Sequence, residues 1–461
     1  MVLSVKERAK ELASIINEHD SVHVITHIDA DGLSAGAIAV ETLKRLGKKY
    51  SIEFIKQVDS SAIKKTNQQQ SDLVWFTDLG SSIADQKFNK PIIITDHHVC
   101  NMNTNFSFHL NPHLFDIDGS YMISGSGTTY LVSKAIHNKN KDLSAIAIVG
   151  ACGDLQNRKY GKLVGKNSEI VQEGKALGVL AEQLDIQCFG RETRPVYKLL
   201  QYASDPIIPG ISGRESKALA FLKELGIPLK EGSKWRKWVD LNNDERRTIL
   251  SAIAKLLLSK GFGHQRVKRL IGEVYLLSKE IMGTELHDAK EFATLLNSTA
   301  RYGEYEIGLQ VCLGNRTTYL KKARSLLQGH RLNLVEGMQF AKNEGIHILD
   351  YTQYFHAKNG IRDTIIGIVT NMLLNDGETR NDLPLVGFAI KSEDEIKASA
   401  RASQELIDKG LDLSIVIQNA AKSVNGVGGG HNIAAGATIP KGKEQAFLSA
   451  FEKEVKHQLS I

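Results

Sequence analysis

Cysteine is scarce in this chain of 461 residues, which contains only four. No two of them form a C-x-x-C pair, which argues against a disulfide framework and against a cysteine-based structural zinc site. The four residues are Cys100, Cys152, Cys188 and Cys312. We therefore expect a reducing, cytoplasmic environment.

Long apolar runs and a strong charge bias are also missing. No stretch approaches the roughly 20 apolar residues of a membrane-spanning helix, so we expect no membrane partner. The N-terminal segment 1–20 has charges spread along an amphipathic helix, without the apolar core of a signal peptide. The formal net charge of +6 permits a nucleic-acid partner but does not require one.

The first 155 residues alternate apolar runs with helical patterns, which predicts an α/β domain with a mostly parallel sheet. The expected strands are 22–26, 51–58, 73–77, 91–95 and 106–110. The expected helices are 33–47, 127–138 and 143–151. Ligands of such sheets bind at the carboxyl ends of the strands.

The rest of the chain divides into three parts. Two prolines and two glycines in "ASDPIIPGISGRES" predict a linker, which we place at 196–215. Apolar spacing is mainly helical over 216–330 and returns to strand and helix patterns over 331–461. We therefore expect a first α/β domain over 1–195, the linker, a helical insertion and a second α/β domain.

Acidic and imidazole side chains gather where the apolar elements of the first domain end. They are His27, Asp29, Asp31, Asp78, Asp96, His97, His98 and Asp154. Most have a simpler interpretation alone: Asp29 and Asp31 could cap a helix, Asp78 could be a cap or turn residue, and His97, His98 and Asp154 could be turn residues. Carboxylates brought together would repel one another, and a bound dication removes that repulsion.

Two dications account for this set better than one, because four ligands satisfy a structural zinc ion. The mixture of carboxylate and imidazole suits manganese, magnesium or catalytic zinc. Two dications bridged by one carboxylate can clamp a phosphoryl group for in-line attack.

A second signal lies at residues 426–436, which read "GVGGGHNIAAG". Consecutive glycines let backbone N–H groups approach a phosphate, and the alanines that follow predict the start of a helix. Arg401, in the strand pattern "SARAS", could pair with a phosphate. The simpler interpretations are a tight turn with a surface histidine and an ordinary strand charge.

The ordered motifs "HIDADG", "TDLG", "TDHH" and "CGD" resemble those of the DHH phosphoesterase superfamily. "GVGGGHNIAAG" with "SARAS" resembles its DHHA1 domain, and the resemblance covers about 20–190 and 335–461. Length, helical middle region and linker are most similar to archaeal RecJ-like nucleases, including the GINS-associated nuclease. The resemblance implies an N-terminal DHH domain, a C-terminal DHHA1 domain and an active site in the cleft between them.

The resemblance also implies a role for each motif residue. One metal would be held by His27, Asp29 and Asp78. The second would be held by Asp31, Asp78, His97 and Asp154, with Asp78 as the bridge. Asp96 would orient a neighbouring imidazole, and His98 would face the scissile phosphate as a catalytic residue. The substrate would be gripped by Arg401, Gly428, Gly429, Gly430 and His431.

The implied function is a single-strand exonuclease of DNA replication or repair that releases mononucleotides with two Mn²⁺ ions, or with Mg²⁺. Digestion from 5′ to 3′ on DNA is favoured, and GINS would be a protein partner. The alternatives are a 3′ to 5′ exonuclease on DNA or RNA, a phosphodiesterase for short oligonucleotides or cyclic dinucleotides, and a GINS-binding scaffold. The basic stretches 234–238 and 266–269 could contact a strand or a partner, or could simply pack a helix.

Overall fold

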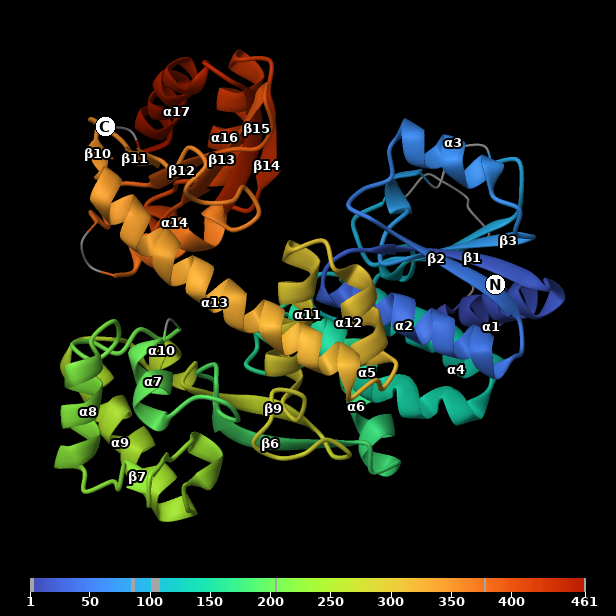
Figure 1. The fold of residues 1–461 in the computed structure, drawn as a ribbon, viewed down its shortest axis with the longest axis horizontal. Helices are drawn as coiled ribbons and strands as arrows, with labels where there is room; N and C mark the ends of the chain where they lie inside the picture. Colours follow the sequence, from blue (N-terminus) through green and yellow to red (C-terminus); the bar gives the residue numbers. More distant parts are fainter. Residues whose placement is uncertain (1–3, 84–87, 101–107, 204, 377–378, 460–461) are drawn as a thin grey trace. The chain divides into compact units, whose positions relative to one another are not determined.

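The computed structural model describes residues 4–83, 88–100, 108–203, 205–376 and 379–459. The chain divides into two compact units, Met1–Leu326 and Leu327–Ile461 (Figure 1). Within these described ranges, no helix has both the length and the apolar character needed to cross a membrane.

A five-stranded parallel sheet forms the centre of the first unit, as expected. Its order is β2-β1-β3-β4-β5. The strands are Ser21–His27 (β1), Lys49–Ile55 (β2), Leu73–Thr77 (β3), Ile92–Thr95 (β4) and His109–Leu110 (β5). The strand expected at 106–110 begins outside the described residues.

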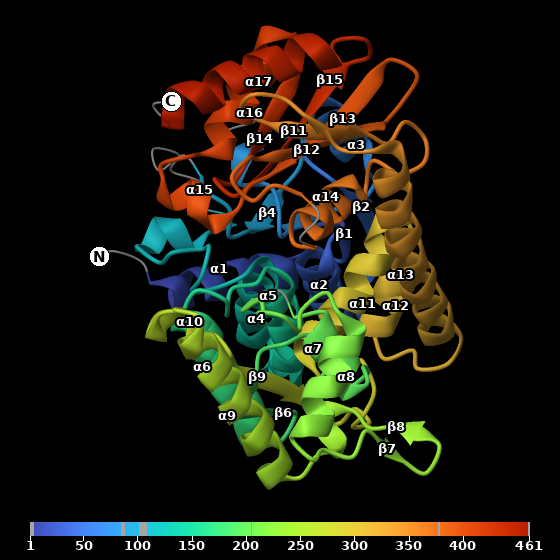
Figure 2. The same ribbon diagram turned by 90° about the vertical axis from the view of Figure 1, so that its left-hand side faces the viewer.

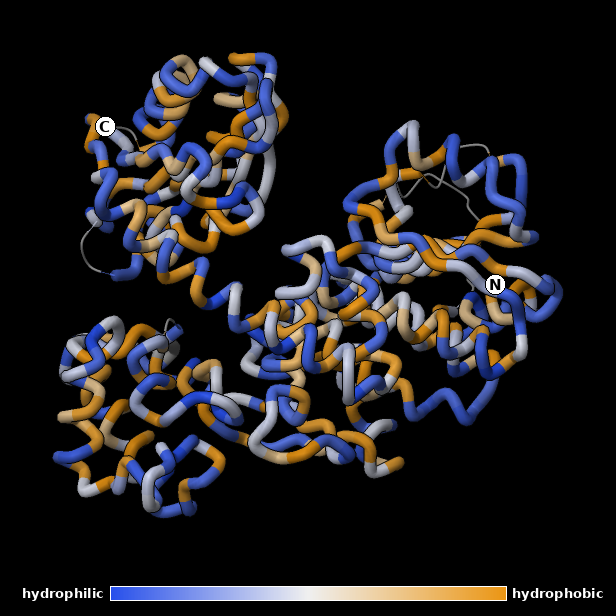
Figure 3. The backbone as a smooth tube through the Cα atoms, in the orientation of Figure 1, coloured by the Kyte–Doolittle hydropathy of each residue, from blue (hydrophilic) through white to orange (hydrophobic). Residues whose placement is uncertain are grey.

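Both faces of this sheet are covered, so the inner strands β3 and β4 are nearly continuous apolar runs (Figure 3). On one face lie α1 (Val5–Glu18), α2 (Ala30–Arg45) and α4 (Gly125–Ile136), and on the other lies α3 (Ser60–Gln68) (Figure 1). Helix α5 (Ser144–Gly153) packs against α2 and α4 and also contacts α11 (Ala289–Arg301). Helices α6 (Gly165–Ala176) and α12 (Tyr305–Cys312) pack against α5 and α2, respectively.

Residues 187–270 form a helical insertion between two antiparallel strands, β6 (Leu180–Ile186) and β9 (Ile271–Leu277). Figures 1 and 2 show it as a separate cluster beside this ribbon. Its elements are α7 (Val196–Gln201), α8 (Glu215–Glu224), β7 (Lys230–Glu231), β8 (Lys234–Trp235), α9 (Asn243–Ser259) and α10 (His264–Lys268). The insertion has a hydrophobic core of its own, in which Trp238 is completely buried.

Two local structures here differ from the sequence interpretation. The segment 196–215, expected as a linker, contains α7 and buries Leu200 and Ile208 in the core of the insertion. Its prolines and glycines shape turns between buried apolar residues, so they do not mark an exposed connection. Strand β9 lies within the stretch that was expected to be helical, because its pairing with β6 outweighs local propensity. The domain boundaries themselves stay a prediction.

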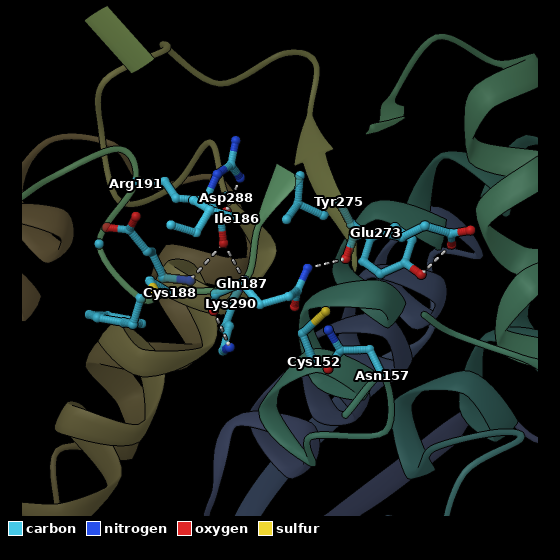
Figure 4. A pocket seen from close by; sticks show the side chains of 14 residues that line it. Cys152, Asn157, Ile186, Gln187, Cys188, Arg191, Glu273, Tyr275, Asp288 and Lys290 are labelled. Carbon is cyan, nitrogen blue, oxygen red and sulfur yellow. Dashed lines mark hydrogen bonds and ion pairs between the residues drawn. The ribbon is translucent and has the colours of Figure 1, made fainter. Parts of the chain in front are cut away.

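A small cavity lies where the β6–β9 ribbon joins α5 and α11 (Figure 4). Its volume of about 20 Å³ has room for about one water molecule. Cys152, Asn157, Arg191, Tyr275 and Asp288 are among the side chains that line it. The cavity is therefore too small to receive a substrate.

The second unit contains a mixed six-stranded sheet of order β10-β11-β12-β13-β15-β14. Its strands are His347–Ile348 (β10), Gln353–His356 (β11), Leu385–Ile390 (β12), Glu395–Arg401 (β13), Val427–Gly430 (β14) and Ala434–Pro440 (β15). Helix α14 (Ile366–Leu374) and the last turns of α13 (Thr318–Glu344) cover one face. Helices α16 (Leu413–Ser423) and α17 (Glu444–Leu459) cover the other, and the short α15 (Gln404–Asp408) follows β13.

The glycine motif of this unit corrects one expectation. Gly428, Gly429 and Gly430 belong to strand β14, and the alanines after His431 begin strand β15 rather than a helix. A Cβ atom on Gly428 would lie 2.7 Å from the side chain of Ile417 in α16. Close packing of strand β14 on helix α16 therefore explains why glycine is present at position 428. The same strand packing outweighs the helix propensity of the alanines that follow.

Candidate metal centre

The strand register brings three of the candidate residues to one edge of the first sheet. Thr77 of β3 pairs with Thr26 of β1 and with Thr95 of β4. The residues that follow these threonines are His27, Asp78 and Asp96. They therefore lie at the carboxyl ends of adjacent parallel strands, where the sequence predicted them.

Asp29 both caps a helix and faces the site. Its Oδ1 accepts the N–H of Gly32 at 3.0 Å, which makes it the N-cap of α2. Its Oδ2 lies 3.0 Å from Nδ1 of His27, which is also 3.6 Å from Oδ2 of Asp78. A Cβ atom on Gly32 would lie 2.3 Å from the carbonyl oxygen of His27, so only glycine lets α2 begin this close to β1.

Asp31 lies in the first turn of α2, where it is completely buried against the N-terminus of α4. Its carboxylate accepts the N–H of Gly125 at 2.6 Å and of Ser126 at 3.1 Å, and also the Ser126 hydroxyl. The positive end of the α4 dipole helps to keep a carboxylate at this position. Asp31 Oδ2 lies 3.9 Å from Nε2 of His97.

His97 is oriented toward the carboxylates by a backbone group. Its Nδ1–H donates to the carbonyl oxygen of Gly119 at 2.7 Å, which leaves Nε2 directed at the carboxylates. Nε2 lies 3.4 Å from Oδ1 of Asp78 and 3.2 Å from Oδ2 of Asp154. Asp154 comes from the end of α5, so four separate segments meet here.

The adjacent His98 has a different environment. Its Nδ1–H donates to Oδ1 of the buried Asp96 at 2.8 Å, and its side chain is 58% exposed. Asp96 also accepts the backbone N–H groups of His97 at 2.8 Å and Ser81 at 2.9 Å. Asp96 therefore orients His98, whereas Gly119 orients His97.

Asp78 is central to the cluster and has an unusual backbone. Its φ of 59° lies in the left-handed region, which is costly for a residue with a side chain. Its N–H donates to the carbonyl oxygen of Thr95 at 2.8 Å. Three groups of side chains have ligand atoms within 4.8 Å of one another: Asp78, His97 and His98; His27, Asp29 and Asp78; Asp31, His97 and Asp154.

The charges in this cluster perturb one another strongly. Burial and the nearby Asp78 raise the pKa of Asp31 to about 7, and burial and Asp31 raise the pKa of Asp154 to about 6. Burial favours neutral His27, but Asp29 and Asp78 raise its pKa to about 11. Burial likewise opposes protonation of His97, yet Asp154 and Asp78 raise its pKa well above the usual value. A positive charge among these carboxylates is therefore strongly stabilised.

A bound dication would supply this positive charge. Asp78 Oδ1 and His97 Nε2 are buried, and neither makes a hydrogen bond to the described part of the chain. His97 Nε2 nevertheless lies within 3.4 Å of carboxylate oxygens of both Asp78 and Asp154. Carboxylate oxygens and a neutral imidazole nitrogen are ligands that manganese and magnesium accept.

The candidate substrate residues of the second unit meet at one end of its sheet. Arg401, the last residue of β13, pairs with Ala434, and the N–H of His431 donates to the Ala434 carbonyl at 2.9 Å. Gly430 pairs with Ala435. Burial alone lowers the pKa of Arg401, so no carboxylate among the described residues offsets its desolvation. Such an environment suits a cation that binds a phosphate.

Sequence reasoning missed the residues that support the ligands. Gly119 orients His97, and Asn297 of α11 accepts the N–H of Ala30 at 3.0 Å beside Asp29. Gln156 is completely buried and donates to the Gly119 carbonyl at 2.8 Å. None of them lies at the end of a predicted strand, and no local pattern distinguishes them from ordinary loop or helix residues.

Comparison with known proteins agrees with this architecture. Residues 188–271 match the family profile of the DHH-CID domain, and residues 351–457 match that of the DHHA1 domain. The chain is 32% identical over 455 residues to the protein MJ0831 of Methanocaldococcus jannaschii, covering 96% of this chain and 95% of that protein.

Solved structures share the fold at low sequence identity. RecJ of Thermus thermophilus in complex with Mn²⁺ has a TM-score of 0.60 and 16% identity over 98% of this chain, which spans only 55% of that RecJ. The same RecJ has also been solved with Mg²⁺. CDC45 of Entamoeba histolytica has a TM-score of 0.67 and 14% identity, with 98% of this chain and 99% of that chain covered. The chain contains a DHH-CID domain and a DHHA1 domain and belongs to the same family as MJ0831.

Proposed function

We propose that this chain is a metal-dependent phosphodiesterase that degrades single-stranded nucleic acid from one end. The observation that carries the proposal is the cluster around Asp78, in which buried ligand atoms without hydrogen bonds to the described residues face several carboxylates. The superfamily, and the RecJ fold in particular, supports a phosphoesterase class for such a cluster.

Each ligand of the cluster has a proposed role. His27, Asp29 and Asp78 would hold one ion, and Asp31, Asp78, His97 and Asp154 would hold the second. The chemistry supplied by a bound pair of dications is neutralisation of the phosphoryl charge and acidification of an attacking water. Manganese is the preferred ion and magnesium the second choice, because imidazoles join the carboxylates among the ligands and magnesium prefers oxygen ligands alone.

Residues beyond the ligands would act on the substrate. His98, held by Asp96 but largely exposed, can place its Nε2 against the scissile phosphate and donate a hydrogen bond to it. Arg401, His431 and the backbone of 428–430 would bind a further phosphate of the strand. Digestion of DNA from 5′ to 3′, a role in replication or repair and association with GINS complete the proposal.

Strands labelled separately at each end, incubated with Mn²⁺ beside a cyclic dinucleotide, test the activity. Release of mononucleotides from one labelled end supports the exonuclease, and the labelled end gives the polarity. Hydrolysis of the cyclic dinucleotide alone would favour the small-molecule phosphodiesterase. Absence of turnover would favour the GINS-binding scaffold, an alternative that draws on the fold shared with CDC45.

A pair of aspartate variants makes this test specific. Asp78→Ala should abolish turnover with little loss of secondary structure. Asp116 is the matched control, because it also has a positive φ, of 56°, but is exposed and outside the cluster. Turnover that survives in Asp78→Ala, or is lost equally in Asp116→Ala, would contradict the bridging role.

A further inference from the structure

Two loops that support the metal ligands also carry aromatic rings. The first contains Gly119, whose carbonyl accepts the His97 imidazole, and Tyr121 follows two residues later. The second begins at Asp154 and reaches Tyr160. Both rings are therefore attached to the segments that position the candidate ligands.

A buried glutamine joins the two loops. The side-chain amide of Gln156 donates to the carbonyl oxygens of Gly119 at 2.8 Å and Ile123 at 3.2 Å. Its Oε1 accepts the side-chain amide of Asn167 at 2.5 Å. Hydrogen bonds thus fix the relative position of the two loops that carry the rings.

The rings and one lysine form a compact group at the surface. Tyr121 and Tyr160 meet edge to face, with centroids 6.2 Å apart. The Lys159 ammonium lies 4.2 Å from the Tyr121 centroid and 5.3 Å from that of Tyr160. Tyr160 is 50% exposed, so its ring is accessible from solvent.

Lys159 differs from the arginine next to it. Arg158 donates to Asp205 at 3.0 Å and is therefore already engaged in an ion pair. No carboxylate forms an ion pair with Lys159 over the described ranges of the chain. Its ammonium can therefore turn toward a phosphate without breaking an ion pair.

We propose that Tyr121, Lys159 and Tyr160 form a subsite for one nucleotide of a single strand, next to the phosphate presented to the metal centre. The inference rests on the proposed function and adds where the strand is held. Tyr160 stacks on the base, Tyr121 supports Tyr160 edge-on, and Lys159 contacts the adjoining phosphate. Aromatic stacking with a nearby cation binds every base, so this subsite is independent of sequence.

Binding measurements test the subsite without requiring turnover. Fluorescence anisotropy with the Asp78→Asn protein gives the affinity for an intact strand and for strands with one abasic residue at successive positions. Tyr160→Ala should weaken binding of the intact strand about 5- to 150-fold. The same substitution should have no effect when the abasic residue occupies the subsite, and Tyr160→Phe should restore binding.

A similar ring–ammonium pair outside the two loops provides the control. Lys322 lies 5.5 Å from the centroid of Tyr319 in α13, and Tyr319→Ala should leave strand affinity unchanged. An equal loss for intact and abasic strands in Tyr160→Ala, no loss at all, or no strand binding by the Asp78→Asn protein would overturn the subsite. Coupling between ring and base without any hydrolysis by the unsubstituted protein would keep the subsite and refute the nuclease. Hydrolysis without coupling would keep the nuclease and refute the subsite.

Discussion

A single added methyl group should disable the metal centre. A Cβ atom on Gly125 would lie 2.1 Å from Oδ1 of Asp78 and 2.6 Å from its Cβ. Carbon–oxygen contacts below 3.0 Å essentially do not occur, so the Asp78 carboxylate would have to move by about 0.9 Å. Metal ligands tolerate displacements of only about 0.2 Å.

We therefore expect Gly125→Ala to weaken Mn²⁺ binding and to reduce turnover by about 100-fold, which a misplacement of roughly 1 Å can cause. Alanine is favoured over glycine within a helix by about 0.5–1 kcal/mol, so α4 should still form. Calorimetric titration with Mn²⁺ and circular dichroism together separate lost metal binding from lost folding.

Two further glycine variants make the reasoning refutable. Gly150→Ala should act in the same way through Asp31, whose Oδ1 would lie 2.2 Å from the new Cβ. Gly329 in α13 has no described atom within 4 Å of an added Cβ, so Gly329→Ala should leave Mn²⁺ binding intact. A folded Gly125→Ala protein that binds Mn²⁺ like the unsubstituted chain would refute the steric argument.

Four other substitutions provide further tests. His97→Ala should weaken Mn²⁺ binding about tenfold or more, whereas His98→Ala should spare it and slow turnover; equal loss of metal in both would contradict this division. Arg401→Ala should weaken strand binding about tenfold or more while calorimetry shows unchanged Mn²⁺ affinity. Burial and Asp288 raise the pKa of Glu291 from 4.5 to about 7. The folded state therefore binds this proton more tightly than the unfolded state does, and the free energy of unfolding falls as the pH rises between these two values. Urea unfolding across that pH interval should show a smaller decline in the free energy of unfolding for Glu291→Gln than for the unsubstituted chain. An unchanged decline would mean that other groups cause it.

Much of the first domain could be predicted because its signals are local. Apolar runs such as 73–77 are bounded by polar residues, and the parallel-sheet rule places Asp78 and Asp96 at one edge. The sequence also identified every residue of the three ligand groups, and the structure brings them together. Their roles as ligands stay predictions.

What sequence reasoning missed depends on contacts between distant segments. The partnership of Gly119 with His97, and that of Asn297 with Ala30, exists only once α11 and the loops have packed. The same holds for 428–430, where pairing with β15 and packing on α16 decide for a strand. Local propensity carries no information on such contacts.

Anomalous scattering from crystals soaked in Mn²⁺ tests the two-ion centre most directly. Two peaks about 3.5–4 Å apart, with the Asp78 carboxylate between them, are expected for a bridged pair. His27 and Asp29 should adjoin one peak, and Asp31, His97 and Asp154 the other. A single peak, or peaks away from Asp78, would contradict the two-ion centre.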